Sequence, residues 1–135
     1  MNNNSIIKLI ITLIDVDSDR LEPETIRLLE RIEELKRLKV IENVERILEP
    51  TSNLSAPSKA GGSHLPGILE IEAEAKQIPR AMISVDQETN LKYEVQLVKK
   101  PDDTIIVDFK RYECSDDEFF SMVAKIKNII IETKV

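Results

Sequence analysis

The hydrophobic pattern begins with a nine-residue apolar run, Ile6–Ile14, whose only charged residue is Lys8. The run is rich in β-branched residues and too short for a typical helix, which predicts a buried strand. Aliphatic residues then recur at steps of three and four over residues 23–39, which predicts an amphipathic helix that begins at Pro23. The apolar stripe of this helix comprises Ile26, Leu29, Ile32, Leu35 and Leu38, with Leu28 beside it.

Residues 40–48 are predicted to form a second strand, after which the composition changes. The segment 49–67 holds all three glycines of the protein, together with several prolines and serines. This composition predicts a flexible loop. A loop this long is unusual inside a domain, so it is either a functional element or a tether between two parts of the sheet.

Residues 68–78 fit two periods. Apolar residues alternate with glutamates over much of the segment, as in a half-buried strand, whereas Ile71, Ala75 and Ile78 share one helix face. The alanine and glutamate content favours a helix, with Pro79 as its stop. The segment is therefore predicted to be a helix, with a strand as the alternative.

The next segments predict strands. Residues 81–85 are predicted to form a short one. The strands 91–98 and 104–109 flank a polar turn that begins at Pro101, which predicts an antiparallel hairpin. One face of the first hairpin strand is apolar throughout and comprises Leu91, Tyr93, Val95 and Leu97.

The last helix is predicted over residues 116–131. Ser115 and Glu118 match a capping box, in which the two side chains satisfy free amides of the first turn. Its apolar stripe is expected to pack against the hairpin face and comprises Phe119, Met122, Val123, Ile126, Ile129 and Ile130.

Strands in one sheet with helices on one face define the fold class as α+β. We expect a two-layer sandwich with a mainly antiparallel sheet of about four to five strands and two or three helices. A chain of 135 residues is a natural size for one domain, so residues 1–135 are predicted to be a single domain.

Composition excludes several classes of partner. The net charge is −6 and is spread along the chain, which argues against nucleic-acid binding and against an anionic membrane surface. The apolar run at the N-terminus is far shorter than the roughly 20 residues that span a bilayer, and no signal-peptide pattern precedes it. One cysteine, Cys114, excludes an internal disulfide and suits a reducing compartment. We expect a cytoplasmic protein.

An acidic turn follows the first predicted strand. Asp15, Asp17 and Asp19 alternate as the carboxylates of an EF-hand loop do. However, Arg20 stands where that loop needs a glycine, and Ile26 stands where it needs a bidentate glutamate. The segment is therefore interpreted as a polar turn rather than a calcium site.

No other pattern indicates catalysis. His64 is the only histidine, and no nucleophile or metal ligand accompanies it at a matching spacing. Lys59, Gly61 and Gly62 lie in a phosphate-loop-like composition without the spacing of a phosphate loop. Cys114 precedes a helix whose acidic first turn opposes a thiolate. We therefore predict no enzyme activity, no metal and no cofactor, with a small enzyme of unrecognised site as an alternative.

The N-terminal half contains four characteristic segments, Leu9–Ile14, Ile26–Glu30, Val44–Arg46 and Pro57–Gly61. In these segments it resembles the effector-associated constant components of bacterial conflict systems. That family implies a small adaptor encoded beside proteases, NTPases and other effectors. The family places a longer apolar helix after the lysine-glycine loop, where this chain has the shorter, glutamate-rich segment 68–78.

The C-terminal part combines Tyr93–Leu97, Ile105–Lys110 and a terminal amphipathic helix. In this arrangement it resembles the kinase-associated regulatory domain at the C-terminus of the AMP-activated kinase family. It implies a regulatory role and a kinase partner, although the several aspartates nearby do not fit the basic lipid-facing surface of some members.

These observations predict a non-catalytic adaptor or regulatory protein that acts by protein–protein interaction. The predicted function is a small component of a bacterial conflict or defence system, with a kinase-associated regulatory domain as the alternative. The partner is expected to be an effector, protease, NTPase or kinase. Its contact is predicted at the flexible loop, through Lys59, Gly61, Gly62 and His64.

Overall fold

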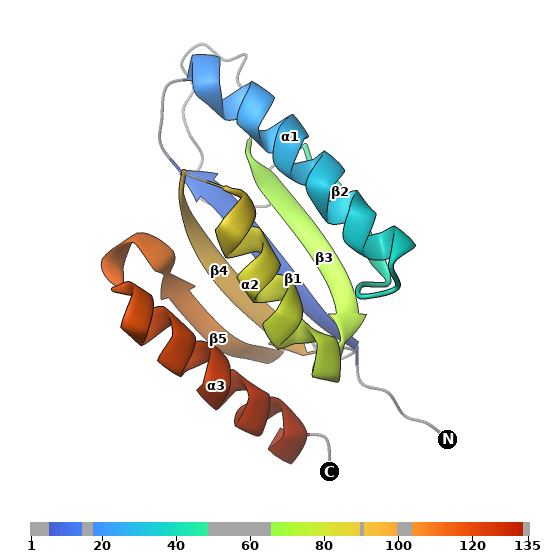
Figure 1. Ribbon diagram of the computed structural model, residues 1–135, viewed down its shortest axis with the longest axis vertical. Helices are drawn as coiled ribbons and strands as arrows, with labels where there is room; N and C mark the ends of the chain where they lie inside the picture. The colour runs from blue at the N-terminus through green and yellow to red at the C-terminus, as the bar shows by residue number, and fades with distance from the viewer. Residues whose placement is uncertain (1–5, 15–17, 49–65, 90, 100–103, 134–135) are drawn as a thin grey trace.

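Five strands form one antiparallel sheet, and three α-helices pack on one of its faces (Figure 1). The structure, a computed structural model, describes residues 6–14, 18–48, 66–89, 91–99 and 104–133. The predicted two-layer α+β sandwich is confirmed. The elements in chain order are β1 (Ile6–Ile14), α1 (Ser18–Arg37), β2 (Asn43–Ile47), β3 (Ile68–Glu74), the 3-10 turn η1 (Ala75–Gln77), α2 (Ile78–Glu88), β4 (Lys92–Lys99), β5 (Thr104–Lys110), the 3-10 turn η2 (Arg111–Glu113) and α3 (Asp116–Thr133).

The strand order is β2-β3-β1-β4-β5, so the first strand of the chain lies in the middle of the sheet. β1 pairs antiparallel with β3 on one side and with β4 on the other. The four strands and two helices from β1 to β4 form two crossovers with a helix in each, in the order of the ferredoxin-like split βαβ motif. β5 and α3 extend this motif at the β4 edge.

The core lies between the sheet and the helices. Side chains alternate across a strand, so the register places Leu9 of β1 beside Ile71 of β3 and Leu97 of β4 on the helix side. The hairpin face predicted from sequence is buried in the same core as α3, and Phe119 of α3 lies against Phe109 of the hairpin. The buried residues of these elements include Ile7, Leu9, Ile11, Leu13, Leu69, Ile71, Ala73, Leu91, Tyr93, Val95, Leu97, Phe119, Val123 and Ile126.

The middle of the chain corrects two predictions. Residues 68–74 form a strand, not a helix, and residues 81–85 lie inside α2 rather than in a strand. In α2, Ile78, Ala81, Met82 and Val85 are buried, at steps of three, one and three that place them on one helix face. Pro79 stands in the first turn, where its missing N–H leaves no hydrogen bond unmade, so it starts this helix instead of ending the previous one.

The apolar stripe of α1 also differs from its prediction. The helix begins at Ser18 rather than at Pro23, and Ile26 and Leu38 are 43% and 64% exposed. Its buried face is set by positions at alternating steps of four and three, which include a threonine whose hydroxyl donates a hydrogen bond to the carbonyl four residues earlier. The residues of this face are Leu21, Thr25, Leu28, Ile32 and Leu35.

α1 ends in a Schellman motif without a glycine. The amide of Val40 donates to the carbonyl of Leu35 at 2.9 Å, and the amide of Lys39 donates to the carbonyl of Lys36 at 3.0 Å. This geometry needs a left-handed residue, and Lys39 has φ 65°. Val40 is thereby turned into the core, where Leu35 also packs.

Replacing Lys39 with glycine should therefore raise the free energy of unfolding, by about 0.5–1 kcal/mol, because glycine carries no Cβ penalty in this conformation. Urea denaturation of the purified variant would measure the change. Lys36→Gly, within the helix, is the matched control and should lower stability. Equal changes at both positions would contradict this account of the helix end.

Gly67 is the last residue of the segment 49–67 that was predicted to be a flexible loop. In the structure it is packed against α1 and β1. Its carbonyl accepts a hydrogen bond of 2.7 Å from the Leu13 amide. A Cβ added there would lie 2.9 Å from Leu21 Cδ1, 3.0 Å from Thr25 Oγ1 and 3.2 Å from Leu13 Cβ. Position 67 therefore requires glycine, because side chains of β1 and α1 lie too close to its backbone to leave room for a Cβ atom.

Gly67→Ala should lower the free energy of unfolding by about 1–3 kcal/mol, as overpacking of a well-packed site does. Thermal denaturation would report the loss. Combining it with Leu21→Ala, which removes the nearest atom, should give a loss smaller than the sum of the two single changes. Strict additivity would argue against the steric explanation.

Candidate functional site

Most residues singled out from sequence lie outside the described part of the chain. They are Lys59, Gly61, Gly62 and His64 of the loop, and Asp15 and Asp17 of the acidic turn. Asp19 is described and is exposed in the first turn of α1, where a carboxylate suits the helix dipole. Within the described residues, His, Cys, Asp and Glu side chains form no group that could hold a metal ion.

Arg46 anchors the point at which the chain re-enters the sheet. It lies on the helix-side face of β2, and its side chain is 10% exposed. The guanidinium donates to both carboxylate oxygens of Glu22 on α1, at 2.9 and 2.8 Å, and to the carbonyl of Pro66, at 3.3 and 3.1 Å. The hydrogen bond from Arg46 lowers the pKa of the Glu22 carboxyl. The arginine thus ties α1 and β2 to the start of β3.

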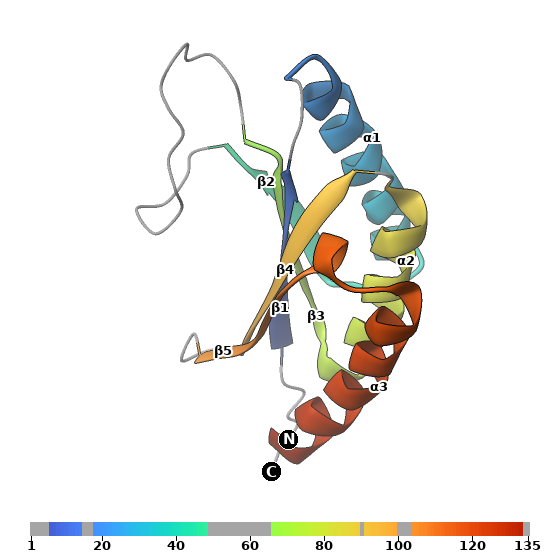
Figure 2. The ribbon, with the colours of Figure 1, turned by 90° about the vertical axis from the view of Figure 1, so that its left-hand side faces the viewer.

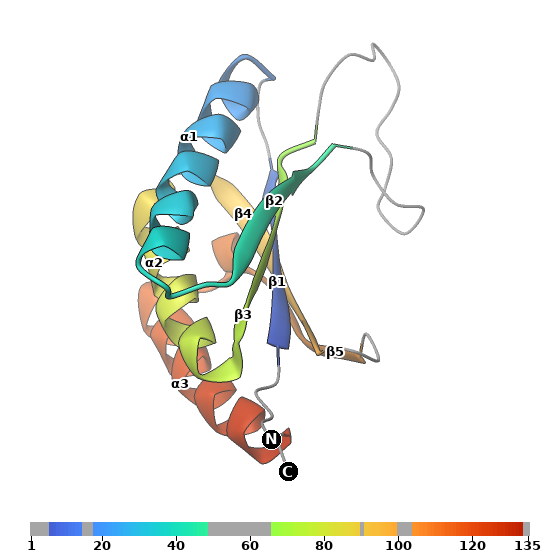
Figure 3. The ribbon, with the colours of Figure 1, turned by 90° about the vertical axis from the view of Figure 1, so that its right-hand side faces the viewer.

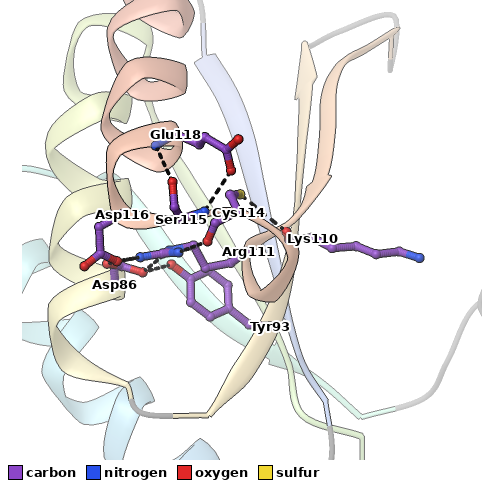
Figure 4. Close-up of polar contacts among 8 residues, drawn as sticks. All are labelled: Asp86, Tyr93, Lys110, Arg111, Cys114, Ser115, Asp116 and Glu118. Atoms are coloured by element: carbon purple, nitrogen blue, oxygen red, sulfur yellow. Dashed lines mark hydrogen bonds and ion pairs between the residues drawn. The ribbon is translucent and has the colours of Figure 1, made fainter.

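A larger group of polar side chains, here called the polar cluster, joins four elements (Figure 4). It comprises Asp86 of α2, Tyr93 of β4, Arg111 of η2 and Asp116 of α3. Arg111 is central to it and donates at 2.7 Å to Asp86 Oδ1, at 2.7 Å to Asp116 Oδ1 and at 2.8 Å to the Cys114 carbonyl. The hydrogen bond to Asp86 raises the pKa of the guanidinium further, so it stays charged.

Two more contacts complete the cluster. The Tyr93 hydroxyl donates to Asp86 Oδ1 at 2.5 Å, and the Arg111 guanidinium lies 4.5 Å from the centroid of the Phe119 ring. Arg111 and Asp86 are only 14% and 19% exposed. A charge this well covered is stable only when it is paired and hydrogen-bonded, which this pair is.

Cys114 and the helix cap lie beside the cluster. The amide of Ser115 donates to Glu118 Oε1 at 2.9 Å and the amide of Glu118 donates to Ser115 Oγ at 3.1 Å, which confirms the predicted capping box. Burial raises the pKa of the Cys114 thiol, while the nearby Arg111 opposes that shift. The thiol is therefore protonated at neutral pH and is a weak nucleophile.

The side chains of the polar cluster are bonded to one another, which limits the chemistry that they can perform. A surface pocket of about 340 Å³ is lined by Asp86, Tyr93, Arg111 and Cys114, among others. An anionic ligand would have to displace two carboxylates from Arg111. The arrangement fits a structural clamp better than a catalytic site.

Sequence reasoning missed this cluster. Its four members come from four elements, and Asp86 and Arg111 are 25 residues apart. Aspartate, tyrosine and arginine at such spacing match no local motif, so the sequence carries no signal for their contact.

Stability should fall at alkaline pH because of Tyr93. Burial, followed by the hydrogen bond to Asp86, raises the pKa of this phenol well above its ordinary value of 10.0. The folded protein then holds a proton that the unfolded chain loses, so stability is intact below about pH 10 and falls above it, by about 1.4 kcal/mol per pH unit.

The measurement uses Tyr112→Phe, so that Tyr93 is the one tyrosine left. Phenolate absorbance should then appear only together with loss of the circular dichroism of the folded state. Tyr93→Phe should flatten the alkaline decline. Phenolate formation in a protein that stays folded near pH 10 would refute this expectation.

The sheet has a second face, which none of the described helices covers. Figure 2 and Figure 3 show α1, α2 and α3 together on the opposite side. On this open face β1 presents Ile6, Ile10 and Ile14 together with Lys8 and Thr12, so aliphatic residues hold three of its five positions there. Such a pattern is typical of strands in sheets that are covered on both sides.

Carboxylates also gather on the open face. Glu70 and Glu72 of β3 and Glu45 of β2 share it, as the register shows. Lys8 of β1 lies beside them and pairs with Glu70 at 3.4 Å. Within the described part of the chain, the carboxylates of Glu45 and Glu72 have no ion-pair partner. The open face therefore combines aliphatic surface with two carboxylates that no described cation pairs.

Among the described residues, no helix is long and apolar enough to cross a membrane. Comparison with models of protein families gives no match for this chain. Searches of curated proteins and of solved structures likewise give no significant match.

Proposed function

We propose that this chain is a non-catalytic interaction module, an adaptor that acts by binding another protein. The observation that carries the proposal is the open face of the sheet, where three of the five β1 residues are isoleucines although no described helix covers them. Exposed apolar surface rimmed by polar residues marks interaction sites. The self-paired polar cluster supports the same conclusion, because its charges are engaged in holding α2, β4, η2 and α3 together.

We further propose that the module belongs to a bacterial conflict or defence system, in which its partner is an effector, protease or NTPase. This proposal rests on the resemblance of the N-terminal half to effector-associated constant components. The genes encoded beside this one are an inexpensive test. Effector and NTPase genes as neighbours would favour this assignment, whereas a kinase gene would favour a kinase-associated regulatory domain.

The direct test is reconstitution. The full chain, used as bait in native host cells, should retain a protein that a bait of equal charge and size does not. The purified pair should then form a complex of defined stoichiometry by analytical ultracentrifugation. Failure to form such a complex, or a turnover activity abolished by Cys114→Ser, would contradict a non-catalytic adaptor.

A further inference from the structure

We infer that the open face of the sheet is the seat of an amphipathic helix from a protein partner, and that the basic flank of that helix lies over β2 and β3. This inference rests on the proposed function and gives its partner a chemistry and an orientation. Three features of the described residues carry it: a continuous aliphatic path, carboxylates on one side of that path, and a length that matches a short helix.

The aliphatic path crosses all five strands. Ile47 is directly opposite Ile68, and Val98 is directly opposite Ile105. Ile10 links the two pairs, since it lies two residues along β1 from the partner of Ile68 and is diagonal to Val98. We call these five residues the aliphatic diagonal.

Different parts of the aliphatic diagonal are accessible to different degrees. Ile68 and Val98 are 4% and 8% exposed, so they form the floor. Ile10 and Ile47 are half-buried, and Ile105 is 54% exposed. The accessible apolar surface thus lies at the middle and at both ends of the diagonal, where an extended object can contact all three.

The side of the diagonal toward β2 and β3 is acidic. Here lie Glu45, Glu70 and Glu72, which we call the carboxylate flank. Lys8 of β1 lies beside them, and Lys36 of α1 reaches this edge of the sheet at Asn43, opposite Glu72. Lys8 pairs with only one of the three carboxylates. A partner that covers this flank must bring positive charge, because burying unpaired carboxylates is unfavourable.

The side toward β4 and β5 is mixed. Glu94 stands directly opposite Lys110, and Asp108 stands opposite Gln96, whose amide donates to it at 3.3 Å. Lys92 adds a second positive charge next to this group. Positive and negative charges are therefore nearly balanced on this side. Because the other side has an excess of carboxylates, the basic flank of a bound helix should lie over β2 and β3.

The dimensions fit a helix of about four turns. Crossing five strands at about 4.8 Å spacing while moving four residues along them gives a path of roughly 23 Å. A helix rises about 1.5 Å per residue, so about 15 residues cover it. The bound helix would cover the isoleucines that β1 presents on the open face.

The same charges argue against a second copy of this chain as the occupant. Two open faces packed together would bring two carboxylate flanks into a dry interface with too few cations to neutralise them. Like charges in such an interface cost several kcal/mol. A polyanion such as nucleic acid is disfavoured for the same reason.

The first test locates the partner contact in native host cells. A photo-crosslinking residue replaces Gln96 on the open face or, as the matched control, the exposed Gln87 on α2. We expect a specific product from position 96 and none from position 87. A product from position 87 alone would overturn the inference and leave the adaptor proposal standing. No product from either position would count against both.

The second test measures the charge and shape preference with a defined probe. A synthetic helical peptide of about 15 leucine and lysine residues, with all lysines on one side, should bind saturably to the full chain. Its counterpart with glutamate in place of lysine should not bind. Equal binding of the two peptides, or no saturable binding of either, would overturn the inference.

Matched variants exclude a general attraction of a basic peptide to an acidic protein. The double variant Glu45→Gln and Glu72→Gln should weaken binding at least about tenfold, which corresponds to about 1.4 kcal/mol. Glu30→Gln with Glu33→Gln, exposed on α1, removes the same charge elsewhere and should change affinity less than about twofold. Equal losses in both double variants would show that the open face is not the site.

Discussion

Arg111→Met should lower the free energy of unfolding by about 3 kcal/mol, near the lower end of the range for breaking a buried ion pair. The change leaves Asp86 with only the Tyr93 hydroxyl, removes the bond to the Cys114 carbonyl and ends the contact with the Phe119 ring. Methionine keeps most of the volume, so the loss reports the polar contacts. Urea denaturation monitored by circular dichroism would measure it.

Arg37→Met provides the matched control. Arg37 pairs with Glu34 at 2.6 Å, as short as the contacts of Arg111, but its side chain is 68% exposed. Exposed pairs contribute about 0–1 kcal/mol, so this change should be nearly silent. Adding Asp86→Asn to Arg111→Met should recover part of the loss, because a neutral amide tolerates the missing cation. Similar losses at both arginines would disprove the clamp.

Two adjacent phenylalanines on α3 should differ strongly when replaced by alanine. Phe119 is 1% exposed, and its ring lies 6.3 Å from that of Phe109. Phe119→Ala should therefore lower the free energy of unfolding by about 3–5 kcal/mol, the usual range for emptying a buried aromatic site.

Phe120 serves as the control for that change. It is 49% exposed and contacts Phe119 edge-to-face, with ring centroids 5.4 Å apart. Phe120→Ala should lose less than about 1.5 kcal/mol, the range of such an aromatic pair. Both are measured by thermal denaturation, and near-equal losses would mean that α3 does not pack on the sheet as described.

Periodicity predicted the parts of the fold in which one period dominates. β1, β4, β5 and α3 lie where the pattern placed them, because a run of β-branched residues or an unbroken apolar stripe leaves no alternative of similar strength. The capping box at Ser115 and Glu118 was predictable for the same reason, since its contacts are three residues apart.

The middle of the chain was not predictable in the same way. Residues 68–78 contain both a strand and the start of a helix, and a single window across them satisfies both periods. Pro79 is consistent with either the end of one helix or the start of the next, and only the burial of Ile78 and Met82 against the sheet decides between them. Tertiary packing therefore outweighed local propensity here.

The candidate site was not predictable from the sequence. The polar cluster forms only when α2, β4, η2 and α3 pack together, and the aliphatic diagonal exists only through strand register. Ile10 and Val98 become neighbours because β1 and β4 pair with one particular offset, and a shift of one residue would send both to the opposite face.

The central position of β1 has a consequence for synthesis on the ribosome. The strand at residues 6–14 emerges before the other four strands of the sheet, but its neighbours begin only at Ile68 and Lys92. An uncharged stretch such as Leu9–Ile14 therefore waits without a pairing partner for some sixty residues of translation, roughly 3–12 seconds at typical elongation rates. During that interval it has the features of an aggregation-prone segment. Nascent chains arrested before residue 68 should consequently recruit chaperones that recognise apolar strands, and chains arrested well beyond residue 99 should release them.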